Sequence, residues 1–300
     1  MAKTVEQTIA EMVKTDAIRD AGLTVPEGID RALDLAYGPD PKWHLLDIYT
    51  PAGATGPLPA IISIHGGGWI YGDKELYSHY CMRLAKRGFA VVNFNYRLAP
   101  QHQYPAPLQD TARLLHWLQQ NAATYHIDLN NLFMVGDSAG GQLCYQILTA
   151  LTNPVYAALC SLQLPKGLQV RACGLNCGCY FIPPLPPRWM GSMLGSYLPT
   201  PLRPVLPQLN TGKYLTAAFP PAFVMSAEND YLKFMAAPLH RLLRRRGVES
   251  ELHIYGAKEQ KEIGHVFHLN CRSALADRCN DEQCTFFRRH LAKTDTATAG

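Results

Sequence analysis

One serine of this chain stands in a setting that suits a nucleophile. The stretch 136–140 is Gly-Asp-Ser-Ala-Gly, with Ser138 between small residues. An apolar run at 132–135 precedes it and apolar residues recur at helical spacing after it, so the sequence predicts a strand-to-helix turn that exposes the hydroxyl. Glycine suits both flanks because so sharp a turn leaves no room for side chains. A glycine-rich turn with no catalytic role can have the same five residues, so a catalytic interpretation of the motif needs a base and oxyanion donors elsewhere in the chain.

A second glycine-rich stretch supplies candidate hydrogen-bond donors. A serine nucleophile needs a base to take its proton and donors to hold the oxyanion that attack creates. Residues 65–69 are His-Gly-Gly-Gly-Trp and follow a buried strand expected over 59–64. We expect the backbone N–H groups of Gly66, Gly67 and Ala139 to form the oxyanion hole, because glycine lets an oxygen approach the main chain closely.

Residues around these two loops are expected to support them. His65 should hold the oxyanion loop by a side-chain hydrogen bond, and Asp137 should brace the serine turn. Residues 71–74 follow the oxyanion loop and are expected to support it. Trp69 either lines the substrate pocket or packs beside the loop, as a large aromatic side chain more often does.

Four motifs in order resemble one known family. They are 65–69, Tyr-Arg-Leu-Ala-Pro at 96–100, Tyr-Pro-Ala-Pro at 104–107, and Gly-Asp-Ser-Ala-Gly-Gly at 136–141. Together they resemble the hormone-sensitive-lipase-like branch of the α/β-hydrolase fold, especially its small bacterial acetyl-esterase-like members, over roughly residues 40–290. The resemblance implies that the nucleophile is Ser138 and that the loop at 65–69 serves as the oxyanion hole.

The general base is expected late in the chain if the order serine, acid, histidine holds. His265, in Gly-His-Val-Phe, matches the His-x-Phe position of the family, and His268 is its nearest rival. His253 lies within an expected strand, where it packs or faces solvent.

The resemblance also suggests the acid. Asp230, with Leu232 two residues later, fits the Asp-x-Leu of the family, and Glu228 is the alternative. The match is partial, because the family often has another acidic residue where Phe234 stands. The carboxylate should be buried and should orient the imidazole of His265.

Alternating strands and helices must position these residues. We expect strands over 44–50, 59–64, 89–95, 131–135, 222–226 and 251–255, and helices over 76–88, 108–121, 231–246 and 272–291. Such alternation predicts an α/β fold with a mainly parallel central sheet, helices on both faces, and ligands bound beyond the carboxyl ends of the strands. The resemblance makes this an α/β-hydrolase with a small helical or loop cap.

Three segments fall outside this pattern. Residues 1–40 are expected to form an N-terminal cap segment, helical to about residue 35, ahead of a core over 41–292. The proline-rich stretch 180–212 is expected to be a lid insertion or, equally, a rigid connector. The small polar tail 293–300 is expected to be disordered.

Composition excludes several classes of function. The net charge of +4 and the absence of basic-aromatic clusters argue against nucleic acid, and 47% apolar residues suffice for a large core. The N-terminus lacks the apolar run of a signal peptide, and no stretch is long enough to span a membrane. Nine cysteines suit free thiols in the cytoplasm. Cys173, Cys177 and Cys179 lack metal-site spacing, so we expect them to pack and expect no metal.

These observations predict a cofactor-free serine esterase whose substrates, from the resemblance, are small carboxylic esters. An amidase or arylformamidase with the same three residues stays open, since the chemistry serves amides too. A non-catalytic ligand receptor of the same fold is the third alternative, although such receptors typically lose one of the three residues. The resemblance also makes a homodimer, paired through the last strand and helix, an option.

Overall fold

A computed structural model describes residues 3–182 and 191–292. In that part of the chain, eight strands form one sheet in the order β1-β2-β4-β3-β5-β6-β7-β8. Strands β1 and β2 run antiparallel to their neighbours, and β3 to β8 are parallel. The strands are β1 Ile29–Ala36, β2 Leu45–Pro51, β3 Leu58–Ile64, β4 Ala90–Phe94, β5 Ile127–Asp137, β6 Val170–Asn176, β7 Ala222–Ala227 and β8 Ser250–Tyr255.

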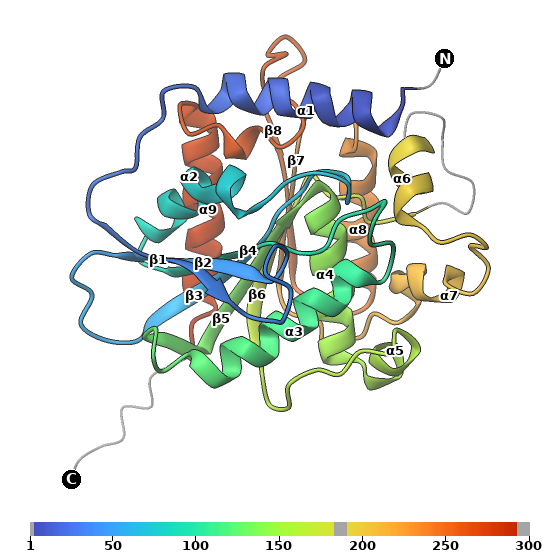
Figure 1. The fold of residues 1–300 in the computed structure, drawn as a ribbon, viewed down its shortest axis with the longest axis horizontal. Coiled ribbons are helices and arrows are strands. Elements are labelled where there is room, and N and C mark those ends of the chain that lie inside the picture. The colour runs from blue at the N-terminus through green and yellow to red at the C-terminus, as the bar shows by residue number, and fades with distance from the viewer. Residues whose placement is uncertain (1–2, 183–190, 293–300) are drawn as a thin grey trace.

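Helices cover both faces of this sheet, as Figure 1 shows. The longer ones are α1 Val5–Asp20, α2 Lys74–Ala85, α3 Ala106–Asn121, α4 Ser138–Thr152, α8 Lys233–Arg245 and α9 Ala274–Arg289. The shorter ones are α5 Pro154–Leu159, α6 Gly191–Tyr197, α7 Leu206–Leu209, η2 Thr211–Lys213 and η3 Phe267–Leu269. Helices α3, α4 and α8 pack on one face, and α2 and α9 on the other, so the fold has three layers.

The strand sequences explain the two cores. In β3, Ile62 and Ile64 face the core under α4, whereas Ile61 faces the core under α2 and α9. Side chains alternate between the faces of a strand, so a strand covered on both sides must be apolar throughout. All five residues of β4 are buried accordingly.

The N-terminal segment differs in part from the sequence prediction. Helix α1 begins at Val5 and ends at Asp20, and the side chains of its N-cap residue Thr4 and of Gln7 form a capping box. Residues 29–36 form the edge strand β1 and pair with β2. The expectation of helix to about residue 35 is therefore wrong for this stretch.

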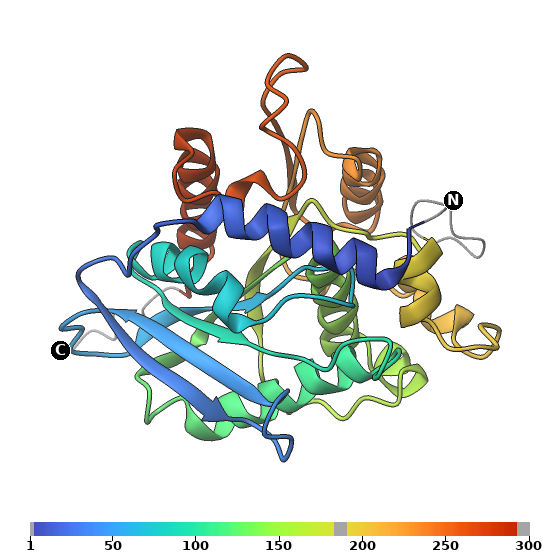
Figure 2. The same cartoon turned by 45° about the horizontal axis from the view of Figure 1, so that its top comes forward.

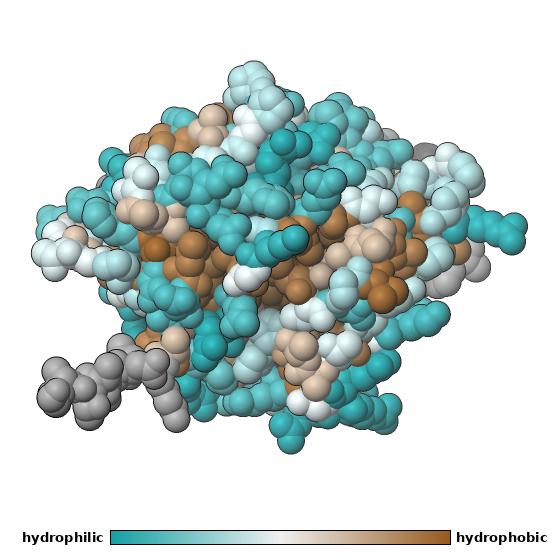
Figure 3. Space-filling view, turned by 90° about the horizontal axis from the view of Figure 1, so that it is seen from below, coloured by the Kyte–Doolittle hydropathy of each residue, from teal (hydrophilic) through white to brown (hydrophobic). Residues whose placement is uncertain are grey.

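Helix α1 lies across the carboxyl ends of the parallel strands (Figures 1 and 2). The face opposite α1 carries a band of apolar side chains bordered by hydrophilic ones (Figure 3). Apolar atoms make up more than half of an ordinary protein surface, so such a band is not unusual. Within the described ranges, no helix has the length and apolar character needed to cross a membrane.

The proline-rich stretch is described only in part. Its residues 183–190 lie outside the described residues, as does the tail expected over 293–300. The remainder contains α6, α7 and η2, joined by irregular segments. This part therefore has short helices of its own, and α6 lies beside the amino-terminal half of α1 (Figure 1).

Candidate active site

The turn between β5 and α4 holds Ser138 in a left-handed conformation, with φ of 52°. Both flanking glycines are needed for packing. A Cβ on Gly136 would lie 2.3 Å from the carbonyl oxygen of Gly140, and a Cβ on Gly140 would lie 2.1 Å from that of Ile64. The close approach of β3, β5 and α4 thus explains why small residues surround the serine.

A continuous hydrogen-bond chain reaches this serine. His265 Nε2 lies 3.0 Å from Ser138 Oγ, and His265 Nδ1 lies 2.7 Å from Asp230 Oδ1. The serine comes from the β5–α4 turn, the aspartate from the segment after β7, and the histidine from the loop between β8 and η3. The structure therefore brings together the three residues that the sequence singled out, and both distances allow proton transfer and imidazole orientation.

Asp230 is held in its ionised form despite burial. Its side chain is fully buried, its Oδ2 accepts a 2.6 Å hydrogen bond from Ser226 Oγ, and its Oδ1 accepts one from the N–H of Leu232. Burial acts to raise the pKa of Asp230, but the hydrogen bond and charge of His265, and then these two donors, outweigh it and lower the pKa below its ordinary value. A negative charge beside His265 stabilises the imidazolium that forms when Ser138 loses its proton.

The rival residues lie elsewhere. His268 is buried in η3 against Tyr80, and neither of its ring nitrogens has a hydrogen-bond partner among the described residues. Burial lowers its pKa to about 3, so it stays neutral. Glu228 pairs with Lys233 at 2.8 Å, and His253 pairs with a glutamate of its own strand and stacks on Phe223.

One of the three expected oxyanion donors already has a hydrogen-bond partner. The N–H of Gly66 donates a 2.8 Å hydrogen bond to the Tyr77 hydroxyl, so it is already occupied. The N–H groups of Gly67, Gly68 and Ala139 donate no hydrogen bond within the described part of the chain. All three residues line the same cavity as Ser138. Among the described residues, Gly67, Gly68 and Ala139 thus bring N–H groups without a hydrogen-bond acceptor to this cavity.

Asp137 and Tyr77 support the oxyanion loop from below. Tyr77 Oη accepts from Gly66 and donates to Asp137 Oδ2 at 2.8 Å. Burial raises the pKa of Asp137 to about 7, against the lowering effects of the Tyr77 hydrogen bond and the charge of His265. This carboxyl group therefore links the serine turn to the oxyanion loop through one hydroxyl.

His65 and Trp69 hold the loop on its other sides. His65 Nδ1 lies 2.7 Å from the carbonyl oxygen of Gly66, and the ring stacks on Tyr96 at 4.1 Å. Burial lowers the pKa of His65 to about 4. Trp69 is 2% exposed, donates from Nε1 to Gln142 and stacks on Tyr197. It borders the cavity, but its contacts are mainly those of a packed side chain.

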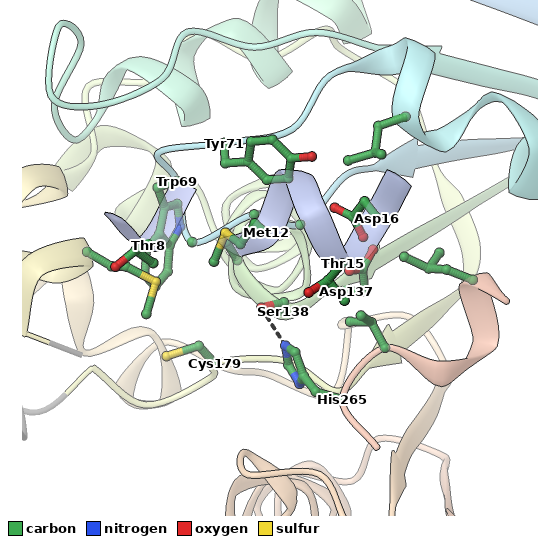
Figure 4. Close-up of a pocket in the computed structure, with 18 of the residues that line it drawn as sticks. Thr8, Met12, Thr15, Asp16, Trp69, Tyr71, Asp137, Ser138, Cys179 and His265 are labelled. Carbon is green, nitrogen blue, oxygen red and sulfur yellow. Dashed lines mark hydrogen bonds between the residues drawn. The ribbon is translucent and has the colours of Figure 1, made fainter. Parts of the chain in front are cut away.

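A cavity of about 320 Å³ lies above the serine (Figure 4). Its floor is the serine turn and the oxyanion loop, and its roof is α1, which contributes Met12, Thr15 and Asp16 among others. Tyr231 borders it with its ring 4.2 Å from that of His265. The arrangement suits a small ester held between a nucleophile and three backbone donors.

The three clustered cysteines pack as expected. Cys173 lies in β6, Cys177 and Cys179 follow it, and all three are buried. Potential metal-ligand atoms of Cys177, Asp230 and His265 lie within 4.8 Å of one another. Both ring nitrogens of His265 are already hydrogen bonded, to Asp230 and Ser138.

Some site residues escaped sequence reasoning. Gly68 stands in the same glycine run as Gly66 and Gly67. What sets Gly66 apart is the hydrogen bond from its N–H to the Tyr77 hydroxyl, which the sequence does not reveal. Asp16 and Met12 of α1 enter the cavity because of how α1 packs on the core. No local pattern in the sequence signals that placement, whereas the glycine run itself could have pointed to Gly68.

Known proteins share the sequence and the fold. The carboxylesterase NlhH of Mycobacterium tuberculosis is 31% identical over 216 residues, covering 68% of this chain and 66% of that one. The versiconal hemiacetal acetate esterase of Dothistroma septosporum is 40% identical over 101 residues, covering 33% of this chain and 31% of its own. The matches thus span from about a third to about two thirds of these relatives.

Solved structures match over nearly the whole chain. Esterase B from Lactobacillus rhamnosis, in a crystal structure with a C4-C4 SN3 tributyrin phosphonate, has a TM-score of 0.88 and 25% identity, covering 96% of this chain and 94% of that chain. A bacterial heroin esterase has the same fold, with a TM-score of 0.75 and 24% identity over 98% of this chain and 95% of that chain. Residues 61–269 match the family model described as the alpha/beta hydrolase fold. This chain belongs to the α/β-hydrolase fold family, which confirms the fold that its motifs predicted.

Proposed function

We propose that this protein is a serine hydrolase that cleaves small carboxylic esters through an acyl-enzyme. The observation that carries the proposal is the hydrogen-bond chain from Asp230 through His265 to Ser138 on the floor of the cavity. The carboxylesterase and esterase relatives, and the esterase structure that shares the fold, support the reaction class.

The proton follows the hydrogen-bond chain. Ser138 Oγ attacks the ester carbonyl while His265 Nε2 takes its proton, and Asp230 stabilises the imidazolium. His265 then returns the proton to the alkoxide oxygen of the leaving alcohol, which departs and leaves the acyl group on Ser138. Water attacks this acyl-enzyme with His265 as base again, which releases the acid and restores the serine.

The negative oxygen of each tetrahedral intermediate is held by backbone donors. In our proposal these are the N–H groups of Gly67, Gly68 and Ala139. Removing one such donor from a hydrolase costs about 2.7–4 kcal/mol of transition-state stabilisation. The Tyr77 hydroxyl fixes the loop by accepting from Gly66, so the donors need no rearrangement when charge develops.

Hydrolysis of p-nitrophenyl acetate, butyrate and laurate tests the proposal. We expect the purified protein to cleave acetate and butyrate fastest, because a cavity of about 320 Å³ has little room for a twelve-carbon chain. Ser138→Ala and His265→Ala should abolish turnover, whereas His268→Ala should keep it. Equal activity of the wild type and Ser138→Ala would rule out the mechanism.

The compartment and the oligomeric state are separate proposals. We infer a cytoplasmic location from nine free thiols, eight of them buried, which suit a reducing compartment. We also infer a homodimer through β8, one of the two edge strands of the sheet, on which Ile254 is 41% exposed. Cell fractionation should place the protein with cytoplasmic markers, and light scattering should give twice the mass of one chain. Recovery outside the cytoplasm or a monomeric mass would contradict the respective inference.

A further inference from the structure

The cavity above Ser138 has two chemically different sides. Figure 4 shows Thr8, Trp69 and Cys179 on one side of the serine and Thr15, Asp16 and Asp137 on the other. The first side is further closed by Met193, whose sulfur would lie 2.6 Å from a Cβ on Gly68. The first side is therefore mainly apolar, with Thr8 as its labelled polar residue, and the second side carries two carboxyl groups.

Asp137 presents an unused hydrogen-bond acceptor to this second side. It is the N-cap residue of α4, yet its side chain makes no capping hydrogen bond. Tyr77 donates to Oδ2, while Oδ1 accepts no hydrogen bond from the described residues, although the residue is 3% exposed. An acceptor so buried and bordering the cavity lacks a partner that a ligand can supply.

Asp16 faces the same side from the roof and is held rigidly. Arg19 Nη1 donates to Asp16 Oδ1 at 2.9 Å, and Arg19 also forms two hydrogen bonds with Asp20. The Asp16 side chain is 18% exposed, and both Asp16 and Asp137 line the cavity. Asp20 shares the same arginine but does not line the cavity.

We propose that this side of the cavity is a subsite for a hydroxyl-bearing arm of the ester, bound by Asp16 and Asp137. The inference rests on the proposed esterase function and specifies its substrate class. A hydroxyl can donate its single proton to a free acceptor position of one of these carboxyl groups, whereas a methyl group of the same size leaves that position without a donor. Sites that hydrogen-bond a substrate hydroxyl discriminate strongly against analogues that lack it.

Two pairs of size-matched esters test the subsite and show which arm it holds. For the alcohol arm the pair is 2-hydroxyethyl butyrate and propyl butyrate, and for the acyl arm it is methyl 3-hydroxybutyrate and methyl 3-methylbutyrate. We expect kcat/KM to favour the hydroxyl ester by about tenfold in one of the pairs, as one hydrogen bond to a charged acceptor allows. The pair that shows the preference identifies the arm that lies against Asp16.

Substitutions on α1 supply the matched comparison. Asp16→Leu should lower the preference to what Asp137 alone supplies, whereas Asp20→Asn, which alters the other partner of Arg19, should leave it at the wild-type value. If circular dichroism shows that Asp16→Leu is unfolded, Asp16→Asn decides. Asp16→Asn should retain a roughly threefold preference in kcat/KM for the hydroxyl ester, because hydrogen bonds to a charged acceptor are about twice as strong as those to a neutral one.

The outcomes separate this inference from the proposed function. Hydrolysis of all four esters without a hydroxyl preference, or an equal loss of preference in Asp16→Leu and Asp20→Asn, would refute the subsite and leave the esterase proposal standing. A wild-type protein that hydrolyses none of them, nor the p-nitrophenyl esters, would refute both.

Discussion

Replacing Asp137 by Asn should change how the stability of the protein depends on pH. Burial raises the pKa of Asp137 from 3.8 to about 7 in the folded protein. Below pH 3.8 the carboxyl group is protonated in both states, and above pH 7 it is ionised in both. Between these values only the unfolded chain loses the proton, so the wild type loses stability as the pH rises through this window.

The size of the effect follows from the window. Each pH unit within it costs 1.36 kcal/mol, so the two units between pH 5 and pH 7 cost about 3 kcal/mol. The asparagine of Asp137→Asn does not titrate, and its side-chain oxygen can still accept from Tyr77. The stability of Asp137→Asn relative to the wild type should therefore increase by about 3 kcal/mol from pH 5 to pH 8.

Urea unfolding of both proteins at pH 5, 6, 7 and 8 measures this difference. Using the change in the difference removes the contributions of titrating groups that both proteins share. A stability difference that is the same at pH 5 and pH 8 would refute the reasoning, because it would mean that Asp137 titrates alike in the folded and unfolded chain.

Two further substitutions test the packing of the site. Ser226→Ala removes a hydrogen-bond donor from the fully buried Asp230, so kcat/KM should fall about tenfold. In the wild type this hydrogen bond lowers the pKa of Asp230, so its removal should raise that pKa and move the acid limb of the pH–rate profile to higher pH. An unchanged profile would contradict this role of Ser226. Gly140→Ala puts a Cβ 2.1 Å from the Ile64 carbonyl oxygen and should lower the free energy of unfolding in urea by about 3 kcal/mol. Gly195→Ala, with open space around its Cβ, is the control and should change this free energy by less than about 1 kcal/mol. Equal effects of the two substitutions would contradict the close packing of the serine turn.

Local patterns and the order of motifs predicted much of the core of the fold. The apolar run before Ser138 and the helical spacing after it predicted the β5–α4 turn, because a buried strand and a helix have different apolar periods. Motif order singled out His265 and Asp230, which the folded chain brings to the serine from segments 127 and 92 residues away in sequence. Parallel strands place their carboxyl ends at one edge, so such distant residues meet there.

Long-range packing produced the errors. Ile29, Ala32, Leu33 and Ala36 have the spacing of a helix, yet pairing with β2 makes this stretch a strand. The sequence also contains no sign that the Gly66 N–H has a partner, since the hydroxyl that accepts from it comes from α2. Similarly, the roof of the cavity depends on α1, which packs across the strand ends through contacts that no local sequence pattern encodes.

Labelling with a fluorophosphonate tests the central claim most directly, since this probe reacts with a serine only when a neighbouring base activates it. Intact mass and peptide mapping should show one probe per chain, attached to Ser138, and His265→Ala should prevent labelling. Absence of labelling, attachment at another serine, or undiminished labelling of His265→Ala would contradict the account.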